Sequence, residues 1–133
     1  MDLLIHQIPI KMKRFTVTLI ALFCLFVTGI MANKTSVEIK APAEVKAGEE
    51  VTIVINVTHN GNSKSHHTDW VYLKINGKEV QRWKYDKASL PPDGNFSLEF
   101  KTVATGTMVI EAQGECNIHG STGVKSLDIK IIN

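Results

Sequence analysis

The sequence predicts an all-β fold: an immunoglobulin-like antiparallel β-sandwich of about seven strands that follows an N-terminal signal segment. Two observations support the sandwich. Apolar and polar residues alternate with a period of two, and turn residues separate the alternating segments. A third observation, a basic start followed by an apolar stretch, sets the first part of the chain apart.

Residues 1–32 are predicted to form a secretory signal. Three basic residues between positions 11 and 14 precede an apolar stretch from Phe15 to Ala32, and this order is typical of export signals. We expect cleavage after Ala32 and a domain, residues 33–133, in the periplasm or another extracytoplasmic compartment. A segment that is not cleaved would instead anchor this domain to the membrane.

The charge and the cysteine count change when the signal is set aside. The chain has 15 basic and 13 acidic residues, of which three basic and one acidic lie in residues 1–32, so twelve of each sign remain. A near-neutral domain lacks the basic patch that nucleic-acid binding requires, and we expect no nucleic-acid partner. Cys24 leaves with the signal, so Cys116 is an inert buried residue, a link to another chain or a metal ligand.

The rest of the sequence divides into short strands and turns. Asn76-Gly77 predicts a type I′ hairpin turn, because both residues tolerate positive φ, and Pro91-Pro92-Asp93-Gly94 is the strongest loop signal. A break at Ala41-Pro42-Ala43 follows the first strand. The expected strands are, in chain order, Val37–Ile39, Val51–Val57, Val71–Ile75, Glu79–Tyr85, Phe96–Phe100, Met108–Ala112 and Leu127–Ile131.

Four histidines remain in residues 33–133, and all lie at the ends of expected strands. His59 follows the second strand, His66 and His67 precede the third, and His119 comes three residues after Cys116, past the sixth strand. Because strand ends of a sandwich gather at one edge, these residues can meet although they are distant in sequence. A thiolate with imidazoles selects iron, zinc or copper over magnesium or calcium.

The string Cys116-Asn117-Ile118-His119-Gly120 is the strongest metal-binding signal. A Cys-x-x-His spacing lets both side chains turn toward one ion, and Gly120 frees the backbone for that turn. A lone Cys-x-x-His arises by chance in many proteins. The cluster of histidines before the third strand favours a metal site, since isolated surface histidines have no reason to gather.

Three motifs together resemble the iron domain of superoxide reductases, the neelaredoxin and desulfoferrodoxin family. They are the Cys116–Gly120 string, His59-Asn60, and His66-His67-Thr68-Asp69-Trp70. The resemblance covers most of residues 33–133, including the segment from Ala43 to Glu49. It implies one mononuclear iron with four equatorial imidazoles and one axial thiolate in an immunoglobulin-like fold.

By motif, Cys116 resembles the axial ligand, and three histidines, numbers 59, 66 and 119, resemble equatorial ligands. The family takes its remaining histidine, and a lysine near the open iron position, from a segment before the first strands. Residues 33–50 contain no histidine. We expect the fourth equatorial position to hold water or His67, whose default role is orienting or at the surface because it alternates with His66. Lys64 is a candidate for the missing cation.

The resemblance implies that ferrous iron reduces superoxide to hydrogen peroxide by one electron, while the thiolate favours oxidation of the metal, as in thiolate-bound haem. An electron-donor protein would be a partner, and a homo-oligomer is compatible with the sequence. One alternative is a cupredoxin-like copper electron carrier, although its usual methionine after the second histidine is missing from Gly120 to Lys125. Another is a non-enzymatic immunoglobulin-like binding module with incidental histidines.

Overall fold

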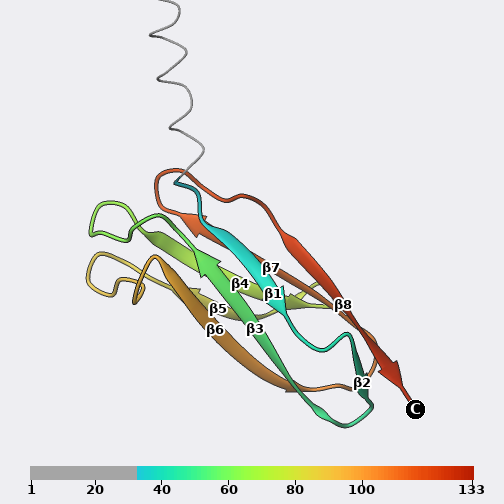
Figure 1. Ribbon diagram of the computed structural model, residues 1–133. Coiled ribbons are helices and arrows are strands. Elements are labelled where there is room, and N and C mark those ends of the chain that lie inside the picture. Colours follow the sequence, from blue (N-terminus) through green and yellow to red (C-terminus); the bar gives the residue numbers. More distant parts are fainter. Residues whose placement is uncertain (1–32) are drawn as a thin grey trace, which may run out of the picture. The chain divides into compact units, whose positions relative to one another are not determined.

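The computed structural model describes residues 33–133, so the predicted signal lies outside the described residues. In this part of the chain, eight strands form two sheets (Figure 1). The smaller sheet has the strand order β1-β3-β6 and the larger one β2-β8-β7-β4-β5. The strands are β1 (Ser36–Lys40), β2 (Glu44–Lys46), β3 (Glu50–Thr58), β4 (Thr68–Ile75), β5 (Lys78–Lys84), β6 (Asn95–Val103), β7 (Met108–Cys116) and β8 (Lys125–Ile132).

The predicted fold class, an all-β sandwich, is confirmed, and all seven expected strands are present. Asn76 and Gly77, between β4 and β5, have φ values of 50° and 80°, the positive values that a type I′ turn requires. The prediction omitted β2, which has only three residues and pairs with β8 in parallel. The sandwich is therefore not antiparallel throughout. Within residues 33–133, no helix is long and apolar enough to cross a membrane.

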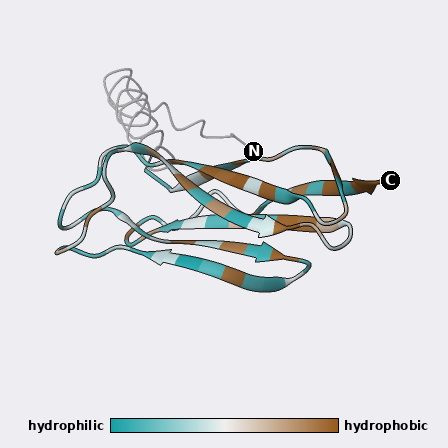
Figure 2. Ribbon diagram, turned by 90° about the horizontal axis from the view of Figure 1, so that it is seen from below, coloured by the Kyte–Doolittle hydropathy of each residue, from teal (hydrophilic) through white to brown (hydrophobic). Residues whose placement is uncertain are grey.

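The core lies between the two sheets and consists of alternate residues of the strands. Apolar and polar segments alternate along the strands in Figure 2, as the period of two requires. Ile53 and Ile55 of β3, Leu73 of β4, Ile110 of β7 and Ile129 of β8 are completely buried. Burial of this apolar layer is the main favourable contribution to folding.

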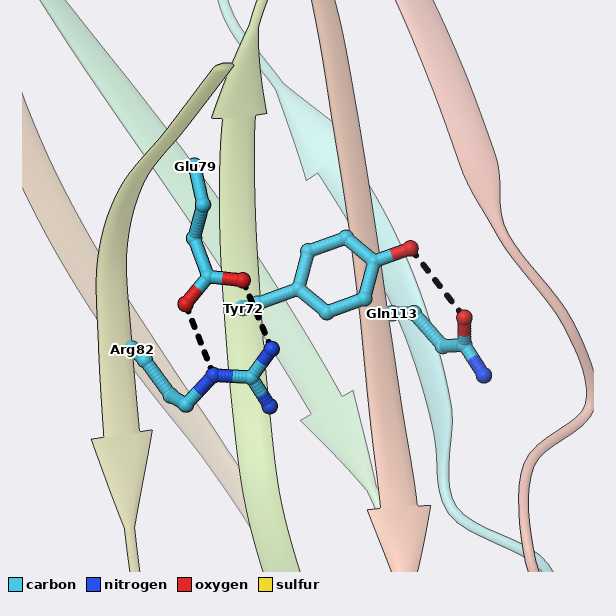
Figure 3. A network of polar contacts seen from close by, with 4 residues as sticks. All are labelled: Tyr72, Glu79, Arg82 and Gln113. Atoms are coloured by element: carbon cyan, nitrogen blue, oxygen red, sulfur yellow. Dashed lines mark hydrogen bonds and ion pairs between the residues drawn. The ribbon is translucent and has the colours of Figure 1, made fainter. Parts of the chain in front are cut away.

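The β4, β5 and β7 strands also carry a network of polar and aromatic side chains outside the core (Figure 3). The Arg82 guanidinium donates two hydrogen bonds, of 2.7 and 2.6 Å, to the Glu79 carboxylate and lies 4.6 Å from the centre of the Trp70 ring. The Tyr72 hydroxyl donates to Gln113 Oε1 at 3.1 Å. The ion pair of Arg82 and Glu79 is exposed and adds little stability. The main effect of Arg82 is therefore to cover the ring of Trp70.

A cavity of about 440 Å³ lies beside this network, and none of its lining residues is a predicted metal ligand. They are Asp69, Trp70, Arg82, Lys84, Tyr85 and Asp86.

Gly114 allows the segment before β1 to pack closely against β7. A Cβ at this position would lie 2.5 Å from Thr35 Cγ2 and 3.2 Å from Val37 Cγ1. Thr35 is completely buried, its Oγ1 lies 3.0 Å from Thr68 Oγ1, and its backbone N–H donates to the carbonyl of Gly120 at 3.2 Å. The close approach at Gly114 therefore holds the start of β1 against the strand ends that carry the predicted ligands.

Gly114→Ala is expected to lower the free energy of unfolding by about 1–3 kcal/mol, because the added methyl group overpacks the buried contact with Thr35 and Val37. Urea unfolding of the purified protein measures the change. Gly106→Ala is the matched control, since an added Cβ there meets open space. Equal unfolding free energies for the two variants would contradict this account of the packing.

Candidate metal centre

Three strands bring the predicted ligands to one end of the sandwich. His59 follows the end of β3 at Thr58, His67 precedes the start of β4 at Thr68, and Cys116 is the last residue of β7. The antiparallel pairing of β4 with β7 places Thr68 opposite Cys116. Because β3 belongs to one sheet and β4 and β7 to the other, the site joins the two layers.

Two histidines and the cysteine form a compact group of ligand atoms. One ring nitrogen of His59, one of His66 and the Cys116 Sγ all lie within 4.8 Å of one another. His59 and Cys116 are buried, with 1% and 3% exposure, whereas His66 is half-buried. His119 adjoins this group, because its Nδ1 lies 3.0 Å from His66 Nε2. The rings of His59 and His119 both meet the His66 ring edge-on.

The two ring nitrogens of His59 have different surroundings. Nδ1 lies 3.0 Å from Asn62 Oδ1, whereas Nε2 is buried and has no hydrogen-bond partner within residues 33–133. Burial, followed by the neighbouring His66, lowers the pKa of His59, although the hydrogen bond to Asn62 acts in the opposite direction. Neutral imidazole is the form that binds metals. A buried nitrogen of this kind fits a metal ion, which would satisfy it.

The Cys116 sulfur lies inside a tight loop that points two backbone N–H groups at it. The amides of Ile118 and His119 lie 3.5 and 3.4 Å from Sγ. Backbone hydrogen bonds between Cys116 and Gly120, in both directions, close the loop. Gly120 has a φ of 78°, which favours glycine and agrees with its predicted role in the turn. These two backbone N–H groups are therefore in place to donate to a sulfur that binds a metal as thiolate.

His67 and Lys64, the other two predicted site residues, lie outside this group of ligand atoms. His67 is buried, and its Nδ1 lies 3.0 Å from the carbonyl oxygen of Ser63. Its backbone N–H donates to Asn117 Oδ1 at 2.9 Å. Lys64 is exposed in the loop between β3 and β4. The functional roles of both residues stay predictions.

Two asparagines whose roles the sequence patterns did not indicate hold the ligand loops. Asn117 Nδ2 donates to the carbonyl of Ser65 at 3.1 Å, so this side chain joins the Cys116 loop to the loop that carries His66. Asn62 contacts His59 directly. Their presence inside the ligand loops was visible in the sequence, but loop residues have no periodicity that shows where a side chain points.

The comparison with protein families identifies the chain. The desulfoferrodoxin family matches residues 30–122, which is more than half of the sequence. The chain therefore belongs to the desulfoferrodoxin family, and the predicted family resemblance is confirmed. Among curated proteins, none matches this sequence.

Solved structures share the fold at low sequence identity. A superoxide reductase (neelaredoxin) from Ignicoccus hospitalis is 22% identical with a TM-score of 0.60, over 77% of this chain and 85% of that one. A provisionally named superoxide reductase from Thermotoga maritima is 24% identical with a TM-score of 0.58, over 74% and 86%. The CARDB domain of a Pyrococcus furiosus protein, in complex with di-metal ions, is 22% identical with a TM-score of 0.58, over 75% and 90%. At these identities the likeness establishes the fold alone.

Two alanine variants test the assignment of the ligands. His59→Ala is expected to lower the iron retained per chain at least about tenfold. Loss of a residue that only orients a ligand lowers metal affinity by about that factor, and loss of the ligand itself should lower it no less. His67→Ala is expected to retain most of the iron, since no ring nitrogen of His67 belongs to the group of ligand atoms. Iron is quantified after anaerobic loading and desalting, with circular dichroism as a check of folding. Equal losses in the two folded variants would show that His67 is a ligand.

Proposed function

We propose that the protein is a superoxide reductase that holds one iron on Cys116 and on three histidines, numbers 59, 66 and 119. The observation that carries this proposal is the buried Nε2 of His59, which lacks a hydrogen-bond partner among the described residues and adjoins His66 and Cys116. Membership of the desulfoferrodoxin family supports iron as the metal. The structural relatives named superoxide reductases support the reaction.

The residues of the site suit this reaction. Bound iron would supply the one-electron chemistry that converts superoxide and two protons into hydrogen peroxide. The amides of Ile118 and His119 would hold a metal-bound Cys116 thiolate, whose negative charge would favour loss of an electron from the iron. His59 is buried, so water is excluded from its side of the site. Lys64, which is exposed, is the proposed cation that attracts superoxide or delivers a proton.

Water is proposed to complete the ligands of bound iron in place of a fourth histidine. Residues 33–50, where the family has its remaining histidine, contain none. The segment at Thr35 runs beside Gly120 and Ser121 and brings no imidazole to this end of the sandwich. His67 is less favoured as a replacement, because its ring nitrogens do not belong to the group of ligand atoms that His59, His66 and Cys116 form.

Three further expectations from the sequence stay proposals: export to the periplasm or another extracytoplasmic compartment, an electron-donor protein as partner, and a homo-oligomer. The copper carrier and the non-enzymatic module remain the alternative functions. The ligands of the site also suit copper, and the fold also suits a binding module. No specific observation favours either function over that of an iron protein.

The function is tested with Cys116→Ser. This variant is expected to lose superoxide reduction and the thiolate-to-iron absorption of the oxidised protein, because an alcohol does not replace the thiolate as a ligand. Stopped-flow measurement of superoxide decay, with visible absorption and circular dichroism, compares it with the iron-loaded wild type. A wild type that binds iron yet consumes superoxide no faster than the folded variant would refute the proposal.

A further inference from the structure

The side-chain amide of Asn62 makes contacts with three separate segments. Its Oδ1 accepts a hydrogen bond of 2.9 Å from the backbone N–H of Thr68 and lies 3.0 Å from His59 Nδ1. Its Nδ2 donates a hydrogen bond of 2.7 Å to the carbonyl of Asp93. One amide therefore links the residue after β3, the first residue of β4 and the loop before β6.

These contacts determine which way the Asn62 amide faces. A backbone N–H can only donate, so the Asn62 atom that faces Thr68 N must be the oxygen. A backbone carbonyl can only accept, so the atom that faces Asp93 must be the NH₂ group. Turning the amide over would break both bonds at once. The assignment therefore follows from the chemistry of the two backbone partners.

The orientation of Asn62 in turn determines the tautomer of neutral His59. Because an oxygen acceptor faces Nδ1, the ring hydrogen belongs on Nδ1 and the free lone pair on Nε2. The opposite tautomer would set two lone pairs against each other at Nδ1. It would also leave a buried N–H at Nε2 that makes no hydrogen bond within the described residues.

We propose that Asn62 is a positioning residue that holds His59 as the Nδ1–H tautomer, with the Nε2 lone pair available to a metal ion. Metal-binding histidines commonly donate their other N–H to an oxygen, which fixes the tautomer and the ring orientation. The identity of the metal rests on the proposed function. The tautomer does not, because it follows from contacts within the chain.

The tautomer is measured by NMR on ¹⁵N-histidine-labelled, metal-free protein, at a pH at which His59 is neutral. Long-range ¹H–¹⁵N correlations distinguish a protonated Nδ1 from a protonated Nε2, and the His59 signals are those that His59→Gln lacks. The wild type is expected to show Nδ1–H. Asn62→Ala is expected to show a mixture or mainly Nε2–H, while Asn62→Asp keeps an oxygen acceptor and is expected to retain Nδ1–H.

Metal affinity provides the second readout, with Co²⁺ as the probe and its thiolate absorption as the signal. Asn62→Ala is expected to bind Co²⁺ about ten- to a hundredfold more weakly than the wild type. Asn62→Asp is expected to restore most of this loss. The control is Asn60→Ala, an exposed asparagine of the same loop, which is expected to bind like the wild type.

A wild-type His59 with its hydrogen on Nε2 would overturn the inference without any variant. An Asn62→Asp protein that behaves like Asn62→Ala would also overturn it, because the effect would then arise from the lost bond to Asp93. If the wild type binds neither Co²⁺ nor iron, the proposed function fails, and the tautomers of the wild type and Asn62→Asp still decide the role of Asn62.

Discussion

The register between β4 and β7 is the constraint on which the site depends. It places Thr68 opposite Cys116, and an irregularity between Thr68 and Trp70 sets Trp70 opposite Glu115. This bulge lets Thr68 face the buried Thr35 while Trp70 contacts Arg82 outside the core. A slip of one residue would reverse the faces of β4 and move the loop that carries His66 away from Cys116. The core residues that fix the register therefore also fix the distance between the ligands.

The site combines a rigid, buried side with a more open side. His59 and Cys116 are almost completely buried, and backbone or amide hydrogen bonds hold both of them. His66 and His119 are only half-buried and contact each other. The metal-binding atoms of His59 and Cys116 are thus oriented before a metal binds, which lowers the entropic cost of binding. The two half-buried histidines form the side of the site that is partly exposed to solvent.

Most of the fold was predictable from alternation, because the long strands each bury one face. The three residues of β2 are too few for a periodic signal, and parallel pairing with β8 has no local signature. The gathering of the ligands at one end of the sandwich was predictable, because the ligands lie at or near the ends of strands. The contacts of Asn62 were not predictable, because they depend on the conformation of the loops. Gly61 has a φ of 81°, and a Cβ at Gly94 would lie 2.8 Å from the carbonyl oxygen of His59. Neither feature is encoded in a periodic pattern.

X-ray absorption at the iron edge tests the central claim most directly, because it reports the atoms bound to the metal without a variant. The account predicts one iron per chain with a single sulfur neighbour, from Cys116, and imidazole nitrogens in the same shell. Their scattering should include the outer ring atoms that mark histidine ligands. Iron bound only to oxygen and nitrogen, with no sulfur neighbour, would contradict the account.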